Sequence, residues 1–268
     1  MSPSSDTTSP ATGPLSALPA GFAASVDAVH AIGEHVLCAV RHAAVERVGL
    51  RPTADGVATP PYGESLRSVG VEGDELVDRS EGDARAGDRR ARITTVRAAG
   101  EFFGVTPGIP GGLWTPVTEP DLDAPLNVDP AAIAVLARWY AFIDAALGAL
   151  HEHAGRHGTM LDPLTLWPEG FDLATTGASV NYGGSPGDQF VTTPYLYVGP
   201  VDRPFPPTTD GEPFWNEPFG ASLRYHDITS LEQAVAFFTR GFDLTAAARA
   251  ASAAAASHDA PDKAGGRA

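Results

Sequence analysis

Apolar residues recur at helical spacing in three long segments of the chain. From Phe22 to Val40 they follow one another at steps of three and four, which predicts a helix over residues 22–48. Asp129-Pro130 is typical of a helix start, with a capping carboxylate before a proline at the first helical position. The helix that follows carries two apolar stripes, so we expect it to be buried between layers. A last core helix is predicted from residue 231 to 242.

Between these helices the pattern changes to short strands separated by turns. Residues 66–71 and 75–78 predict a hairpin, and a short helix is expected at 94–103. Further strands are predicted in the second half at 164–167, 171–176, 180–182, 195–198 and 221–225. The order of helix, strands and helix thus occurs twice. We therefore predict an α+β fold in which two helix–antiparallel-sheet halves pack around the central helix.

Short matches between the halves favour an internal duplication. They pair Arg51-Pro52 with Trp167-Pro168, Ala58-Thr59 with Ala174-Thr175, and Tyr62-Gly63-x-Ser65 with Tyr182-Gly183-x-Ser185. We expect one globular domain over residues 21–245, with halves at 21–104 and 129–245. Residues 1–20 are rich in Ser, Thr and Pro and are expected to be disordered. Residues 246–268 are expected to form an Ala-rich helical extension and a disordered tail.

Composition narrows the classes of partner. The 268 residues include 18 Lys and Arg against 33 Asp and Glu, a formal net charge of −15. Such a charge repels phosphate backbones and anionic lipid, so we expect no nucleic acid and no membrane as partner. The N-terminus has no basic cluster followed by an apolar run, and no stretch approaches about 18 consecutive apolar residues, so we expect a cytoplasmic location. The single lysine, Lys263, together with abundant Ala, Gly and Pro, indicates a GC-rich bacterial genome. The single cysteine, Cys38, excludes an internal disulfide and Cys-rich zinc sites.

Four patterns suggest chemistry, and for each a structural role is the stronger interpretation. Gly183 to Gly187 fits G-x-S-x-G, but Pro186 lacks the N–H that a nucleophile elbow needs after its serine. His153 and His157 share a helix face, as metal ligands do, yet they also suit a helix C-terminus. The other two are the Asp27, His30 and Glu34 face and the arginine-rich stretch 79–92, where interleaved acids favour a solvated hairpin loop. We expect neither metal nor cofactor.

The most unusual segments alternate aromatic rings with glycines and short polar side chains. Such a mixture is typical of a pocket wall, although aromatic packing on a twisted sheet accounts for the same residues. The predicted ligand-binding residues are Trp167, Phe171, Asp172, Asn181, Tyr182, Tyr195, Tyr197 and Trp215. Glu169 and Asp172 are the candidate catalytic carboxylates, if burial separates their pKa values.

These segments also carry a resemblance. The residues concerned are Trp167-Pro168-Glu169-x-Phe171-Asp172-Leu173-Ala174, Asn181-Tyr182-Gly183-x-Ser185-Pro186-Gly187-Asp188 and Phe214-Trp215-Asn216-x-Pro218-Phe219-Gly220. In them the chain resembles a family of uncharacterised conserved bacterial proteins over about residues 22–242. It is more distantly similar to a bacterial domain-of-unknown-function family with a related Phe-Asp-Leu-Ala stretch. Neither resemblance implies an activity or a catalytic residue.

Three functions follow as hypotheses. The first is binding of a small molecule in an aromatic-lined cleft. The second is an enzyme, of hydrolase or isomerase type, with Glu169 or Asp172 as general acid or base. The third is a structural or partner-binding protein. Two carboxyl groups close together in one cleft would favour chemistry, carboxylates held by backbone N–H groups at turns would favour a scaffold, and a flat exposed apolar patch would favour a partner.

Overall fold

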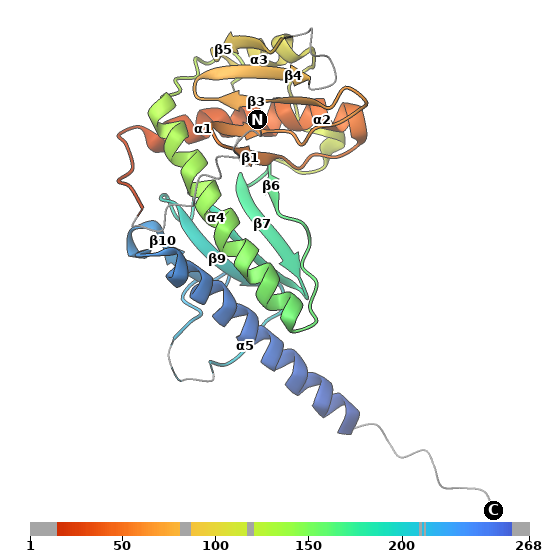
Figure 1. The fold of residues 1–268 in the computed structure, drawn as a ribbon, viewed down its shortest axis with the longest axis vertical. Helices are drawn as coiled ribbons and strands as arrows, with labels where there is room; N and C mark the ends of the chain where they lie inside the picture. The colour runs from red at the N-terminus through yellow and green to blue at the C-terminus, as the bar shows by residue number, and fades with distance from the viewer. Residues whose placement is uncertain (1–14, 81–86, 117–120, 209–210, 212, 259–268) are drawn as a thin grey trace, which may run out of the picture.

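The fold is α+β, with two antiparallel sheets of five strands each (Figure 1). The computed structural model describes residues 15–80, 87–116, 121–208, 211 and 213–258. In both sheets the strands neighbour one another in chain order. The first sheet consists of β1 (Arg51–Thr53), β2 (Gly56–Ala58), β3 (Arg67–Glu72), β4 (Glu75–Ser80) and β5 (Arg89–Arg92). The second consists of β6 (Thr165–Trp167), β7 (Asp172–Gly177), β8 (Val180–Ser185), β9 (Tyr195–Pro200) and β10 (Ala221–Arg224).

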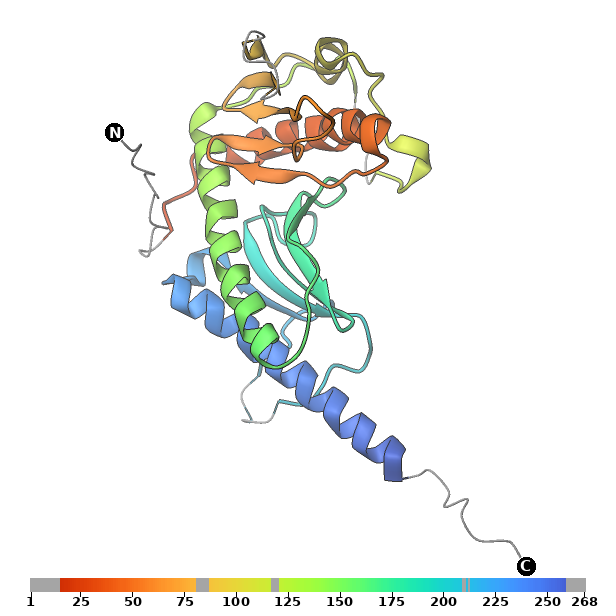
Figure 2. The ribbon, with the colours of Figure 1, turned by 45° about the vertical axis from the view of Figure 1, so that its right-hand side comes forward.

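The helices cover one face of each sheet. In the first half α1 (Phe22–Ile32), the π-helical turn η1 (Gly33–Leu37) and α2 (Cys38–Val45) form one rod behind the strands (Figure 2). The remaining helices are α3 (Val96–Phe103), α4 (Pro130–Arg156) and α5 (Leu231–His258), with short 3₁₀ turns η2 (Pro110–Gly112) and η3 (Tyr225–Asp227). The end of α5 extends beyond the body of the molecule in both ribbon views (Figures 1 and 2).

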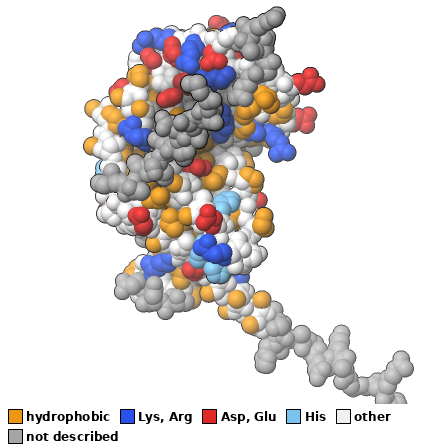
Figure 3. All heavy atoms as spheres, in the orientation of Figure 1, with side chains coloured by type: hydrophobic (Ala, Val, Ile, Leu, Met, Phe, Trp, Pro, Cys, Tyr) orange, Lys and Arg blue, Asp and Glu red, His pale blue; other side chains and the backbone are white. Residues whose placement is uncertain are grey.

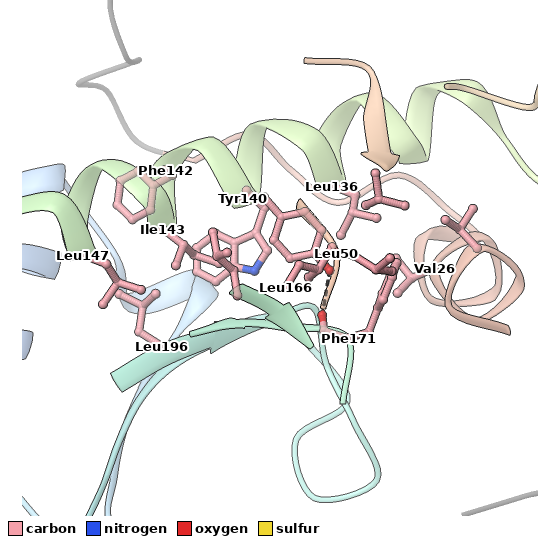
Figure 4. Close-up of a cluster of buried hydrophobic side chains, with 14 of the residues drawn as sticks. Val26, Leu50, Leu136, Tyr140, Phe142, Ile143, Leu147, Leu166, Phe171 and Leu196 are labelled. Carbon is pink, nitrogen blue, oxygen red and sulfur yellow. Dashed lines mark hydrogen bonds between the residues drawn. The ribbon is translucent and has the colours of Figure 1, made fainter. Parts of the chain in front are cut away.

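Helix α4 is the element that joins the two halves. The side chain of Asp129 caps it by accepting from the N–H of Ala131 at 2.9 Å, and Pro130 follows at the first position, as the sequence predicts. The helix contacts α1, β1 and β2 on one side and β7, β8 and α5 on the other. Figure 4 shows Leu136, Tyr140 and Ile143 pointing from it into the core. Each large side chain buried in this way contributes about 1.5–3 kcal/mol relative to exposure.

An isolated bridge between two residues links the first sheet to the second, where β1 and β6 are in contact. Leu50 and Leu166, just before β1 and within β6, form an antiparallel bridge with N–H to C=O distances of 2.8 and 3.1 Å. The match of Arg51-Pro52 with Trp167-Pro168, predicted from the sequence, begins one residue after these two positions. In both sheets an alanine also lies opposite a glycine, Ala58 opposite Gly70 and Ala174 opposite Gly183. The order of elements is the same in both halves, and their origin by duplication stays a prediction.

The two tyrosines of one proposed match lie at different places in the two halves. Tyr62 precedes β3 and pairs with Arg67 in an isolated bridge, whereas Tyr182 lies in the middle of β8. Leu50 and Leu166 are 116 positions apart in the sequence, whereas Tyr62 and Tyr182 are 120 positions apart, so the two matches require different alignments of the halves. The likeness of Tyr62-Gly63-x-Ser65 to the later stretch is therefore not a structural correspondence.

The described ends of the arginine-rich stretch 79–92 lie mostly in strands. β4 runs to Ser80 and β5 covers Arg89–Arg92, because arginines on the sheet pair with acids on neighbouring strands. Arg79 and Arg90 both contact Glu72, at 3.0 and 2.7 Å. Figure 3 shows blue and red side chains intermingled over this part of the molecule. The expectations for Glu81, Asp83 and Arg85 lie outside the described residues.

The segment before α1 lies against the body. Leu15 and Leu18 pack against the core, and the carbonyl oxygen of Ser16 accepts from the hydroxyl of Tyr225 at 2.8 Å. The sequence predicts disorder for residues 1–20, and residues 15–20 depart from it because two leucines find apolar surface. Residues 1–14 and 259–268, for which disorder is also expected, lie outside the described residues.

Two helical segments have the length and apolar composition of a membrane span. They are Phe22–Val45 and Pro130–Arg156, and 67% and 61% of their most apolar windows are buried inside the fold. Buried core helices of water-soluble proteins have the same character. These helices therefore do not decide where the protein resides.

Candidate functional site

The second sheet has one face against helices and one face turned away from them. Side chains alternate between the faces, as they must along a strand. Tyr182, Leu196 and Val198 are buried on the helix side, where Gly184 also lies close to Ile143 of α4. Residues of the opposite parity, which we call the outer face, are Asp172, Asn181, Ser185, Tyr195 and Tyr197.

The outer face is hollowed by a cavity of about 450 Å³. Its floor is formed by β7, β8 and β9, and the segments that follow β8 and β9 form its walls. The lining residues are Gly170, Asp172, Asn181, Ser185, Asp188, Phe190, Tyr195, Tyr197, Gly199, Pro200, Val201, Arg203 and Phe219. The volume is within the range of small-molecule pockets.

Asp172 and Tyr197 form the central polar pair of this cavity. The Tyr197 hydroxyl donates a hydrogen bond to Oδ2 of Asp172. Burial raises the pKa of Asp172 to about 6; the bond from Tyr197 opposes the rise, and the carboxylates of Glu169 and Asp188 add to it. Burial, together with the nearby Asp172, also raises the pKa of Tyr197, so this hydroxyl stays protonated and donates. Asp172 thus changes its charge near neutral pH.

Gly183 makes this pair possible. It lies in β8 between the two residues' strands, opposite Ala174 on one side and Tyr197 on the other. A Cβ atom at this position would stand 2.5 Å from the Tyr197 Oη and 2.9 Å from the Ala174 Cβ. The tyrosine ring can therefore lie across β8 and reach Asp172 only because residue 183 has no side chain.

Asp188 is the second carboxylate of the cavity, and it is fully engaged. Its Oδ1 accepts from the backbone N–H groups of Phe190 and Val191 at 2.7 and 2.8 Å. Its Oδ2 accepts from the Tyr195 hydroxyl at 2.6 Å. Asp188 therefore shapes the turn after β8 and fixes Tyr195.

Aromatic and apolar groups surround these polar pairs. The ring of Tyr195 has its centroid 6.1 Å from those of both Tyr197 and Phe219. At the rim Phe190 and Val201 are 75% and 64% exposed, unusual values for such side chains. A hollow with rings on its wall and apolar groups at its mouth can exclude water from a small bound molecule.

The structure brings four of the eight predicted ligand-binding residues to the cavity. They are Asp172, Asn181, Tyr195 and Tyr197. The side-chain oxygen of Asn181 accepts from the Thr176 hydroxyl at 2.8 Å. The other four predicted residues do not line this cavity.

Phe171 and Tyr182 are turned the wrong way for it. Phe171 is fully buried, stacks on His30 at 4.9 Å, and adopts a left-handed conformation with φ of 52°. Its carbonyl oxygen accepts from the buried Tyr140 hydroxyl at 2.6 Å. Tyr182 lies on the helix side of β8, one residue from Asn181 and so on the opposite face.

Trp167 and Trp215 lie on other surfaces. Trp167 is 42% exposed, at the end of β6 opposite Asp172 but outside the cavity lining. Trp215 is half-buried against Phe214 and donates its indole N–H to the Pro206 carbonyl at 2.6 Å. Sequence reasoning missed Asp188, Phe190, Val201, Arg203 and Phe219. Side chains alternate between the two faces of β8 and β9, and this pattern identifies the outward-facing positions. The segments that follow these two strands carry the five missed residues.

Only one of the two candidate catalytic carboxylates lies in the cavity. Asp172 lies in the cavity, whereas Glu169 is exposed in the β6–β7 turn and is not part of the lining. Glu169 acts on Asp172 only through its charge, which contributes to the raised pKa. Glu169 and Asp172 therefore do not form an acid–base pair within the cavity.

The serine of Gly183 to Gly187 has a structural role. Ser185 is buried at the end of β8, and its hydroxyl accepts from the Gly187 N–H at 3.1 Å. Its carbonyl oxygen accepts from the Trp139 indole at 2.9 Å. A turn follows it and no helix begins there, so the arrangement is not a nucleophile elbow.

The histidine side chains singled out in the sequence also make structural contacts. His153 pairs with Asp243 at 2.8 Å and links α4 to α5, while His157 Nδ1 bonds to the His153 carbonyl oxygen at 2.9 Å. His30 bonds to the Pro168 carbonyl oxygen at 2.8 Å, and burial lowers its pKa. Within the described ranges no group of three or more His, Cys, Asp or Glu is placed to hold a metal ion.

Glu34 holds the connector between the halves. It lies in the π-helical turn and accepts from the Trp114 indole at 2.7 Å and contacts His35 at 3.2 Å. Burial acts to raise the pKa of Glu34, but the hydrogen bonds from His35 and Trp114 outweigh it, and the pKa is lowered. A π-helical turn often marks a functional position, and here it presents Glu34 to the connector.

A second, larger hollow of about 570 Å³ lies between the start of α1 and residues 125–129. The charged side chains of its lining already have partners. Asp74 pairs with Arg92 at 3.0 Å, and Asp129 caps α4. We therefore regard the outer-face cavity, with its aromatic wall and titrating carboxyl group, as the candidate site.

Comparison with protein-family models, with curated proteins and with solved structures gives no match to this chain.

Proposed function

We propose that this protein binds a small molecule in the outer-face cavity, with Asp172 and Tyr197 as its polar anchor. The observation that carries the proposal is a titrating carboxyl group on the floor of an aromatic-lined hollow, held in place by a tyrosine hydroxyl. Pockets combine apolar area with a few oriented polar groups in this way. The net charge of −15 supports a neutral or cationic ligand, and neither nucleic acid nor lipid.

The arrangement of carboxylates favours binding over chemistry. Asp188 is committed to two backbone N–H groups and to Tyr195, and Glu169 lies outside the cavity. One observation keeps an enzyme as the second candidate. A pKa of about 6 suits a general base at neutral pH, and Asp172 would be that base.

A thermal-shift screen of purified protein against a metabolite library tests the proposal. A ligand at a hundredfold excess over its Kd stabilises the folded state by about 2.7 kcal/mol, which raises the melting temperature measurably. Tyr197→Phe removes the hydroxyl that holds Asp172, and we expect it to weaken a true hit about tenfold. Turnover of the hit, followed by mass spectrometry and lost in Asp172→Asn, would favour the enzyme.

Tyr182→Phe is the matched control. It removes the same hydroxyl from the neighbouring strand, but on the helix side of the sheet. We expect hits to bind this variant as they bind the original protein. Hits that respond equally to both substitutions, or to neither, would argue that the ligand lies elsewhere.

A further inference from the structure

Half-buried carboxylates in this protein generally have an arginine partner. Asp78 contacts Arg67 at 2.9 Å and Arg89 at 3.1 Å. Glu72 is held by two arginines, and Glu217 bonds to Arg224. Such partners compensate the cost of removing a negative charge from water.

Asp172 departs from this pattern. Among the residues that the structure describes, its side-chain partner is the neutral hydroxyl of Tyr197, and no arginine, lysine or histidine forms an ion pair with it. The charged groups that act on its pKa are Glu169 and Asp188, both negative. The cavity floor therefore carries a negative charge that the chain itself leaves uncompensated.

The surroundings of this charge are suited to a cation. Tyr195, Tyr197, Phe190 and Phe219 all line the cavity, and aromatic faces attract positive charge within about 6 Å of the ring centroid. Arg203 is the one cationic side chain in the lining as described. It is exposed, and its guanidinium stacks over Phe205 at 4.2 Å, so solvent screens it from the floor.

We propose that the ligand of this cavity is a small organic cation, an amine or quaternary ammonium compound whose positive charge lies against Asp172 among the tyrosine rings. The inference rests on the proposed function, since it names the chemical class that the same cavity binds. A cation supplies the compensation that arginine gives to Asp78 and Glu72. An anion would meet two carboxylates, and a neutral molecule would leave the charge of Asp172 uncompensated.

Affinity should then depend on pH with a definite sign. The titratable groups that act on Asp172 are Tyr195 and Tyr197 from β9, Tyr140 from α4, Asp188 from the turn after β8, and Glu169 from the β6–β7 turn. In the free protein the carboxyl group is protonated below about pH 6. A cation binds the charged form, so its affinity rises with pH through this range, by about tenfold between pH 5 and pH 8. Binding releases a proton near pH 6.

Matched probes of one shape and different charge test the inference. We would titrate the protein by calorimetry with choline, with its neutral isostere 3,3-dimethylbutan-1-ol, and with the anion 3,3-dimethylbutanoate. Benzylamine, benzyl alcohol and benzoate form a second series. At pH 8 we expect each cation to bind about tenfold or more tightly than its neutral counterpart. Asp172→Asn should remove this preference, and Asp123→Asn, at an exposed ion pair with Arg97, should keep it.

Several results would overturn the inference. Equal affinity for cation and neutral isostere would do so, as would a preference that survives in Asp172→Asn or affinity that falls as pH rises. Absence of response to both cations would do so as well. The proposed function is judged separately, because a neutral or anionic library hit that Tyr197→Phe weakens and Tyr182→Phe does not would still support binding in this cavity.

Discussion

The carboxyl group of Asp172 and the hydroxyl group of Tyr197 lie on strands that are not paired with each other, and they meet across Gly183. Strand β8 separates β7 from β9, and at its centre the missing side chain leaves room for the tyrosine ring. The anchor of the candidate site is thus a consequence of strand register and of one glycine.

Gly183→Ala should displace Tyr197 and destabilise the fold. The added methyl group would lie 2.5 Å from the tyrosine oxygen and 2.9 Å from Ala174, so the ring must move. We expect a loss of about 1–3 kcal/mol in urea unfolding, as for other overpacked sites, together with loss of ligand binding. Gly148→Ala in α4 is the control, since its Cβ meets nothing within 4 Å and alanine favours helix. Equal stability of the two variants would contradict the placement of Tyr197.

Asp172→Asn should stabilise the protein at alkaline pH and lose that advantage in acid. Because the folded-state pKa of about 6 exceeds the ordinary value, the folded protein retains a proton that the unfolded chain releases, and stability falls as pH rises from about 4 to 6. The asparagine variant avoids this fall. We expect it to gain about 1–2 kcal/mol at pH 8, allowing for partial solvent exposure, and to gain little at pH 4.5.

Melting temperatures of both proteins across this pH range measure the effect. Asp123→Asn is the control of opposite sign, because the hydrogen bond from Arg97 lowers the pKa of Asp123. We expect no gain from it at pH 8. An Asp172→Asn variant that is less stable than the original protein at pH 8 would show that the carboxylate is compensated after all.

Leu166→Ala should weaken the junction between the halves. The leucine is fully buried next to α4, and its backbone forms the bridge to Leu50. Removing a buried leucine side chain costs about 2–5 kcal/mol. Leu113→Ala, at an exposed position, should cost little. Denaturant unfolding checks both, and a loss below about 1 kcal/mol for Leu166→Ala would contradict a shared core at this place.

Trp114→Phe should loosen the connector that follows α3. The indole N–H bonds to the Glu34 carboxylate, and the Gly108 N–H bonds to the His35 carbonyl oxygen at 2.8 Å in the same contact area. Without the indole donor a buried carboxylate loses a partner, so we expect faster hydrogen exchange at the Gly108 amide. Trp215→Phe removes an indole bond in the second half and should leave this amide unchanged. Unchanged exchange in Trp114→Phe would argue that Glu34 does not hold the connector.

Periodicity in the sequence predicts most of the fold. The two-striped helix after Asp129 is α4, and the alternating runs around Asn181 and Tyr197 are β8 and β9. Strand β5 is harder to predict, because three arginines in four residues have the composition of a solvated loop. Most of their carboxylate partners are on β3, on β4 and in the turn between them, and only the sheet register brings them together.

The site is predictable only in part, because composition does not tell which way a ring points. Asn181 and Tyr182 are adjacent in sequence and therefore face opposite sides of the sheet. Phe171 turns into the first half, where Gly33 of the π-helical turn leaves room for its ring. A Cβ atom added at Gly33 would lie 3.1 Å from the Phe171 ring. That contact spans 138 positions of the chain, and no local pattern contains it.

The most direct measurement is a crystal structure of the protein with the strongest ligand from the library screen. We expect electron density for the ligand in the outer-face cavity, in contact with the Asp172 carboxyl group and the rings of Tyr195 and Tyr197. Density in the larger hollow beside residues 125–129, with the outer-face cavity empty, would contradict the central claim.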